Sequence, residues 1–141
     1  MIIAALMLLV MVPLLSVFAE SGTNWNAVYY NSNDLSGPVV YTEVLPNGID
    51  INWGTGSPAA PVNVDNFSAR FTSVQSFNAG IYEFRVSSDD GVRMYIDGVR
   101  VLDKYSPRVL ATDVFQQTLT AGTHSITVEY VEFTDQAALR V

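Results

Sequence analysis

The feature that most constrains the fold is a series of short segments in which apolar and polar residues alternate, separated by Gly, Pro, Asn or Asp. The pattern begins near residue 25, and beyond it no stretch of ten or more residues keeps a helical period. Its clearest case is residues 125–130, where every second side chain is apolar. A period of two predicts strands with one buried face. The chain is therefore expected to be all-β.

The expected strands are short and regularly spaced, and they are rich in residue types that favour strands, such as Val, Ile, Thr, Tyr and Phe. Asp97-Gly98 separates two of them and predicts a two-residue hairpin turn, because both residues can adopt positive φ. Short strands with such turns indicate a single antiparallel β-sandwich or barrel. The expected strands cover residues 25–30, 39–44, 49–53, 67–73, 81–87, 92–97, 99–103, 114–119, 124–131 and 137–141.

The alternation also predicts which side chains meet in the core. Residues that share the apolar face of their strand are expected to be mostly buried. They are Tyr82, Phe84, Val86, Met94, Ile96, Ile126, Val128 and Tyr130.

Residues 1–19 form an apolar stretch without a charged side chain, and they end in Val17-Phe18-Ala19. This pattern predicts a secretory signal peptide that is cleaved after Ala19. The stretch is also close to the roughly 20 residues that span a bilayer, so an uncleaved membrane anchor is the alternative. Either reading places residues 20–141, as one domain, in a secreted protein or on the extracellular surface.

The charge of the chain limits its partners. Seven basic residues stand against fourteen acidic ones, and the net charge of −7 lies entirely beyond residue 19. Nucleic acid is excluded as a partner, because phosphate binding requires a basic surface. Membrane contact is expected only through an uncleaved leader, and no signal for an oligomeric state is present. The absence of cysteine excludes a disulfide scaffold and a thiolate metal site.

No catalytic centre is recognisable. His124 is the only histidine and opens an expected strand, where a residue at the rim of the fold is the simpler interpretation. No nucleophile signature or phosphate-binding glycine loop occurs. Acidic residues such as Glu83, Glu129 and Glu132 are of the type that a glycosidase uses, but no spacing pairs them. The protein is therefore expected not to be an enzyme.

One acidic motif, Ser88-Asp89-Asp90-Gly91, follows an expected strand. Adjacent carboxylates repel each other and favour neutralisation by a hard cation, for which Ca²⁺ with its preference for oxygen ligands is the natural candidate. A turn in which Asp and Gly only supply loop conformations is the alternative.

Several segments, in order along the chain, resemble the PA14 domain. The resemblance implies an antiparallel β-sandwich or barrel, found in bacterial toxins, surface proteins, glycosidases and yeast adhesins, that commonly binds carbohydrate. The segments are residues 25–31, residues 35–39, residues 65–70, Ser88-Asp89-Asp90-Gly91-Val92-Arg93, residues 99–103, residues 121–124 and residues 128–130.

The resemblance also implies a site. In sugar-binding members, two consecutive aspartates joined by a cis peptide hold a calcium ion that contacts sugar hydroxyls, and Asp89 and Asp90 match this pair. A further ligand comes from a later loop, for which Asp135 is the nearest candidate. The implied function is an extracellular calcium-dependent carbohydrate-binding module with a glycan or polysaccharide as partner. The alternative is a structural or adhesion spacer domain of a larger surface protein or secreted enzyme.

Overall fold

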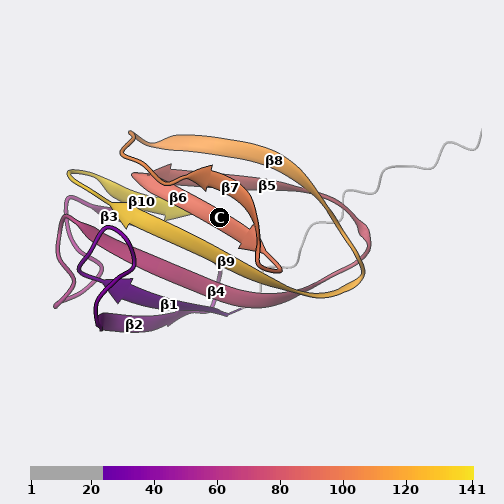
Figure 1. Ribbon diagram of the computed structural model, residues 1–141, viewed down its shortest axis with the longest axis horizontal. Coiled ribbons are helices and arrows are strands. Elements are labelled where there is room, and N and C mark those ends of the chain that lie inside the picture. The colour runs from indigo at the N-terminus through magenta and orange to yellow at the C-terminus, as the bar shows by residue number, and fades with distance from the viewer. Residues whose placement is uncertain (1–23) are drawn as a thin grey trace, which may run out of the picture.

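The computed structural model describes residues 24–141, which form strands joined by turns and loops (Figure 1). Each expected segment corresponds to one strand, so the all-β prediction is confirmed. Several strands run further than expected, because pairing satisfies the backbone of residues without a strand preference of their own. The strands are β1 (Trp25–Tyr30), β2 (Val39–Leu45), β3 (Asp50–Gly54), β4 (Phe67–Phe77), β5 (Gly80–Asp89), β6 (Gly91–Ile96), β7 (Val99–Lys104), β8 (Ala111–Leu119), β9 (Gly122–Glu132) and β10 (Ala137–Arg140).

Two antiparallel sheets pack face to face as a sandwich. The six-stranded sheet has the order β2-β1-β4-β9-β6-β7, and the four-stranded sheet has the order β3-β10-β5-β8. The longest pairing joins β4 and β9, from Phe67 opposite Glu132 to Phe77 opposite Gly122. Residues 24–141 contain no helix of the length and apolarity that crossing a membrane requires. The predicted leader and its cleavage after Ala19 lie outside the described residues.

The core lies between the sheets, and alternation along the strands fills it. Seven of the eight side chains that the sequence assigns to the core are buried. Phe84 is the exception and is only partly buried. It lies on β5, beside the edge strand β8, where neighbouring side chains cover the ring only in part. Its ring stacks on Phe115 of β8 with centroids 5.5 Å apart. Burial of Phe84 was therefore overestimated from sequence.

Five connections gather at one end of the sandwich, at the left of Figure 1, which we term the loop end. Hydrogen bonds join them in space: the Asn66 N–H donates to the Phe133 carbonyl at 3.2 Å, and the Asn63 N–H donates to Asn31 Oδ1 at 2.8 Å. β1 runs toward this end and β10 runs away from it. The five connections are residues 31–38, residues 55–66, Asp90, residues 105–110 and residues 133–136.

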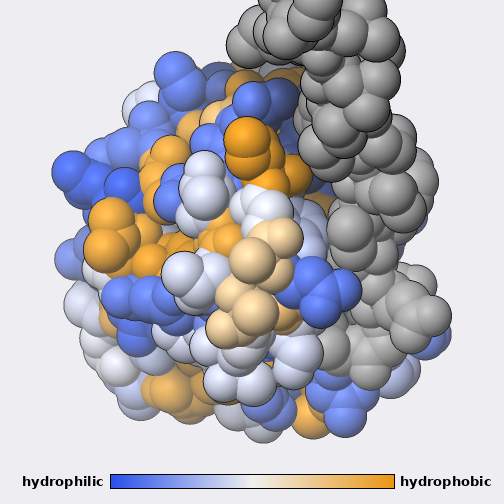
Figure 2. All heavy atoms as spheres, turned by 90° about the vertical axis from the view of Figure 1, so that its right-hand side faces the viewer, coloured by the Kyte–Doolittle hydropathy of each residue, from blue (hydrophilic) through white to orange (hydrophobic). Residues whose placement is uncertain are grey.

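The opposite end carries the β4–β5 and β8–β9 turns. Figure 2 looks onto this end and shows separate hydrophobic areas among hydrophilic ones rather than one continuous patch. Exposed apolar side chains toward this end of their strands include Val74, Ile81 and Val99.

The Asp97-Gly98 hairpin between β6 and β7 forms as predicted. Asp97 and Gly98 have φ angles of +51° and +77°, and Ile96 pairs with Val99. The Asp97 carboxylate also ties the hairpin to β9, because Oδ1 accepts a hydrogen bond from the Ser125 N–H at 2.9 Å. Its Oδ2 lies 2.6 Å from His124 Nδ1. His124 is thus a buried anchor of this hairpin.

Gly98→Val tests the turn. A β-branched residue is strained at positive φ, so this variant should lower the free energy of unfolding by about 1–3 kcal/mol. Gly98→Asn is the control, because Asn tolerates positive φ, and its loss should be smaller. Urea unfolding of both variants measures the difference. Equal stability of the two variants would show that backbone conformation does not decide this position.

The Asp97–His124 pair predicts a pH dependence of stability. The hydrogen bond to Asp97 raises the pKa of His124 above 6.5, and the same bond lowers the pKa of Asp97 below 3.8. The histidine contribution is therefore complete below pH 6.5 and is lost as pH rises through the folded pKa. The aspartate contribution is complete above pH 3.8 and is lost as pH falls.

The stability that His124→Gln removes should consequently be largest between pH 3.8 and 6.5. Thermal unfolding of wild type and variant across pH measures it, and a difference independent of pH would contradict the assignment.

Candidate ligand site at the loop end

Asp90 is the centre of the loop end. Its side chain is buried, and both of its oxygens accept hydrogen bonds from backbone N–H groups of other segments. Oδ1 accepts from Arg108 at 2.8 Å, and Oδ2 accepts from Phe133 at 2.9 Å and from Thr134 at 3.4 Å. Because a buried carboxylate is stable only when it is paired or hydrogen-bonded, these contacts hold residues 105–110 and 133–136 in place.

Arg108 brings a positive charge beside Asp90. Its guanidinium binds Asp113 Oδ2 at 2.7 Å, donates to Ser88 Oγ at 2.7 Å and reaches the Asp90 carbonyl at 3.3 Å. The Ser88 hydroxyl in turn donates to that carbonyl at 2.7 Å. Arg108 therefore connects the end of β5 with the beginning of β8.

Asp89 is half-buried and differs from Asp90 in having one open oxygen. Its Oδ2 accepts a hydrogen bond from the Leu110 N–H at 3.1 Å, whereas Oδ1 has no donor among residues 24–141. Burial raises the pKa of Asp89, and the neighbouring charge of Asp90 adds to the effect. Val109 and Leu110 are exposed beside it, at 83% and 61%. The Asp89–Asp90 peptide bond is cis, as the resemblance predicts.

A third carboxylate, Glu132, lies fully buried behind the Asp pair. Its Oε2 lies 2.8 Å from the Tyr130 hydroxyl, which also contacts the Asp89 carbonyl. A hydroxyl carries one hydrogen, so both contacts are hydrogen bonds when Glu132 is protonated and donates to Tyr130. Burial raises the pKa of Glu132 to about 7, which favours this protonated form.

Residues 105–110, which we term the strap, extend from the loop end onto the outer face of the six-stranded sheet. A Cβ atom added to Gly91 would lie 2.7 Å from the backbone nitrogen of Ser106, so only glycine permits this close approach. The ring of Tyr105 covers the guanidinium of Arg93, 3.9 Å from its carbon. Burial raises the pKa of Tyr105 to about 12.

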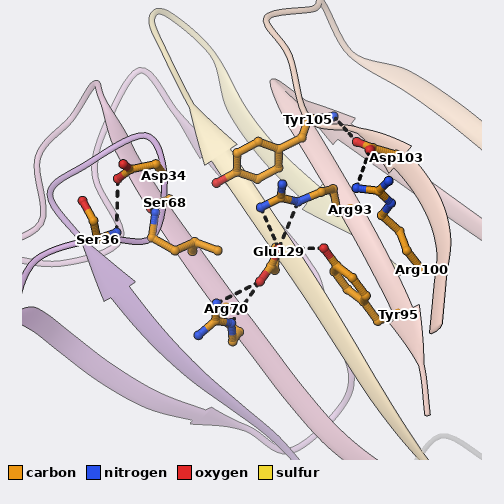
Figure 3. Close-up of polar contacts among 11 residues, drawn as sticks. Asp34, Ser36, Ser68, Arg70, Arg93, Tyr95, Arg100, Asp103, Tyr105 and Glu129 are labelled. Carbon is orange, nitrogen blue, oxygen red and sulfur yellow. Dashed lines mark hydrogen bonds and ion pairs between the residues drawn. The ribbon is translucent and has the colours of Figure 1, made fainter. Parts of the chain in front are cut away.

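Glu129 lies on that outer face, where the arginines of two flanking strands converge on it (Figure 3). Arg70 of β4 binds Oε1 at 2.9 Å, and Arg93 of β6 binds Oε2 at 2.8 Å. The Tyr95 hydroxyl lies 3.4 Å from Oε2. With both oxygens engaged and the side chain buried, Glu129 is a structural residue. Sequence reasoning missed this cluster, because only the strand register places the two arginines beside Glu129.

Asp135 lies at the loop end near the Asp pair, and its charge contributes weakly to the raised pKa of Asp89. Its backbone has a φ angle of +83°, and its N–H donates to Asp65 Oδ1 at 3.2 Å. Within residues 24–141, no three His, Cys, Asp or Glu side chains are grouped as a metal site. Asp89 and Asp90 are adjacent in the chain, and Asp135 lies in a neighbouring loop, where its hydrogen bond within residues 24–141 is to Asp65. Calcium binding by these residues stays a prediction.

Gly91→Ala tests the packing of the strap. The added methyl group would push the Ser106 backbone away and weaken the hydrogen bonds from Arg108 and Leu110 to the Asp pair. Overpacking of this kind costs about 1–3 kcal/mol. Urea unfolding should show the loss, and the amide hydrogens of Arg108 and Leu110 should exchange faster.

Gly80→Ala is the matched control, because a Cβ atom there would lie 3.7 Å from the Tyr82 ring, an ordinary contact. Slow exchange at Arg108 and Leu110 in the Gly91 variant would show that the strap does not depend on this contact.

Two relatives with a shared description match most of the chain. The anti-sigma-I factor RsgI3 of Acetivibrio thermocellus is 31% identical over 123 residues, which is 86% of this chain and 19% of that protein. A solved structure described as an anti-sigma factor domain-containing protein is 31% identical, with a TM-score of 0.75, and the match covers 85% of this chain and 41% of that one. The chain therefore spans about a fifth of RsgI3 and less than half of the solved relative.

These relatives overturn the function that the sequence resemblance implied. Neither a calcium-dependent carbohydrate-binding module nor a spacer domain describes them, because their names connect this type of domain with anti-sigma factors. The implied function was wrong because it was taken from the fold family as a whole, whose members serve many roles.

The family itself is as predicted. A solved PA14 sugar-binding domain from an RTX adhesin has the same fold, with 21% identity, a TM-score of 0.66 and coverage of 84% of this chain and 88% of that one. The family model of the PA14 domain matches residues 20–138. This chain belongs to the PA14 domain family.

Proposed function

We propose that this chain is the ligand-sensing domain of a regulatory protein of the anti-sigma-factor type. The observation that carries the proposal is the 31% identity with RsgI3 over 86% of this chain. The solved anti-sigma factor domain-containing protein supports it with equal identity and a closely similar fold. The matched part is a minor share of either relative, so the proposal assigns detection to this domain and the regulatory output to other parts of a longer protein.

The loop end is the part of the domain that suits detection. β1 runs toward it and β10 runs away from it, so neither Trp25 nor Val141 lies among the five loops. Asp89 offers an open carboxylate oxygen there, and Val109 and Leu110 add exposed apolar surface. A ligand that touches both kinds of group would gain hydrogen bonds as well as buried apolar area.

The same residues connect a ligand to the rest of the domain. Asp89 and Asp90 accept hydrogen bonds from the backbone of Leu110 and Arg108, both in the strap. A ligand that binds Asp89 therefore acts on the strap, which in turn packs on Gly91 and Arg93. This contact path supports a sensing role, because occupancy at the loop end can alter packing on the six-stranded sheet.

The ligand class forms a second part of the proposal. A PA14 relative is described as a sugar-binding domain, and we infer that the ligand here is a glycan or polysaccharide outside the cytoplasm. Sugar hydroxyls can donate hydrogen bonds to an ionised carboxylate such as Asp89. The predicted absence of catalytic activity is part of the same proposal.

Calcium would act at Asp89 if it binds. Burial raises the pKa of this carboxyl and the charge of Asp90 adds to the effect, and a bound cation would favour the ionised form. Both oxygens of Asp90 already accept hydrogen bonds from backbone N–H groups. Calcium usually takes roughly 6–8 oxygen ligands, so most of them would come from backbone carbonyls, water or the bound glycan. Asp89 and Asp90 would hold the ion, which would neutralise the negative charge of their carboxylates.

A chimera tests the sensing role. The matching segment of RsgI3 is replaced by residues 20–141, and sigma-I-dependent transcription is measured while neutral and acidic polysaccharides are added. Transcription should change with at least one polysaccharide, and Asp89→Ala should abolish the change. Repeating the measurement with a chelator shows whether a cation takes part.

Glu83→Ala is the matched control, because Glu83 is an exposed acidic residue near the start of β5 whose partner is Arg85, away from the strap. This variant should respond like the unaltered chimera. A chimera that binds a polysaccharide without any change in transcription would refute sensing, and an unchanged response of the Asp89 variant would refute the loop end as the site.

A further inference from the structure

The two sheets leave four edge strands, and three of them are protected against pairing with another chain. β2 carries Glu43, and β7 carries Arg100, Asp103 and Lys104. β3 has five residues, begins with Asp50 and ends in a glycine. Charges and short length are the usual means by which native sheets prevent edge-to-edge association.

β8 has none of these protections over most of its length. From residue 114 to residue 119 its sequence is VFQQTL, which contains no charge, Pro or Gly. Its one charged residue, Asp113, is paired with Arg108 at the loop end. Within residues 24–141, β5 is the strand that pairs with β8, and its other edge pairs with none. In Figure 1, β8 forms the upper margin of the molecule.

The core beside β8 is also incompletely covered. Phe84 and Phe115 stack 5.5 Å apart but remain partly buried, although most other aromatic residues between the sheets are buried. On the outer side of the strand, Val114 is 51% exposed. A strand added to β8 would cover the backbone edge and these apolar side chains together.

A second copy of the chain fits this edge. In an antiparallel arrangement about a twofold axis at Gln116, Val114 of one copy lies opposite Thr118 of the other, and the two Gln116 side chains face each other. Asp113 lies opposite Leu119, so the two Asp113 carboxylates are about 20 Å apart along the strands. That separation exceeds the screening length of roughly 8 Å at physiological salt. No like charges therefore oppose each other across the new edge.

We propose that two copies of this domain associate through antiparallel pairing of β8 with β8, which joins their four-stranded sheets into one continuous sheet. The strap and the loop end stay free in this arrangement, because the pairing centres on Gln116 in the middle of the strand. The interface is independent of the proposed ligand.

Sedimentation velocity over a wide range of protein concentration tests the pairing. The full chain and a version that begins at Glu20 are measured side by side, so that the apolar leader is not mistaken for the interface. Each should approach twice its own mass as concentration rises, which for the full chain is twice 15.4 kDa. Gln116→Lys places like charges opposite each other and should raise the dissociation constant at least about tenfold. Gln116→Glu should do the same.

An equal mixture of the Gln116→Lys and Gln116→Glu proteins should associate again, because opposite charges then meet at the axis. Thr42→Lys, a charge on the edge strand β2, is the control and should leave association unchanged. A wild-type protein that stays monomeric at every concentration would overturn the proposal. So would a dimer that persists in Gln116→Lys, or a mixture that fails to associate.

Discussion

The hydrogen bonds to the Asp90 carboxylate are the interaction on which the loop end depends. The sheets determine where each strand ends, but they do not determine the path of the connections beyond. Asp90 lies between β5 and β6, and backbone groups from the strap and from residues 133–136 donate to it. A buried carboxylate that lost these donors would be strongly unfavourable. The two loops and the aspartate therefore hold one another in position.

Two other buried carboxylates show different solutions to the same electrostatic problem. Glu129 is neutralised by Arg70 and Arg93 and stabilises the outer face of the six-stranded sheet. Glu132 has no cation beside it in the described part of the chain, and burial shifts its pKa to about 7, so that protonation removes much of its charge. Asp90 keeps its position through backbone donors. Asp89 is half-buried rather than buried and has an oxygen without a donor within residues 24–141, which makes it the chemically available member of the group.

The relation to anti-sigma factors changes how this arrangement is understood. A domain that only anchors a protein to a sugar needs no connection between its site and its remaining surface. The proposed sensing role requires one, and the strap provides the contacts for it: its backbone donates to the Asp pair, and Tyr105 packs on Arg93 of the outer face of the six-stranded sheet. An open β8 edge would also allow two such domains to act together.

The ten strands, the Asp97-Gly98 turn and seven of the eight proposed core residues could be predicted from the sequence alone. Alternation and turn chemistry are local properties of the chain, so a pattern of neighbouring residues is enough to recognise them. The sequence also placed Asp89 and Asp90 together, because they are adjacent. Three features of the site required the folded structure: Asp90 accepts hydrogen bonds from the backbone of two loops, Arg108 lies beside it, and the Asp135 N–H donates to Asp65. These contacts join residues far apart in the sequence, and strand register and loop packing create them after the chain has folded.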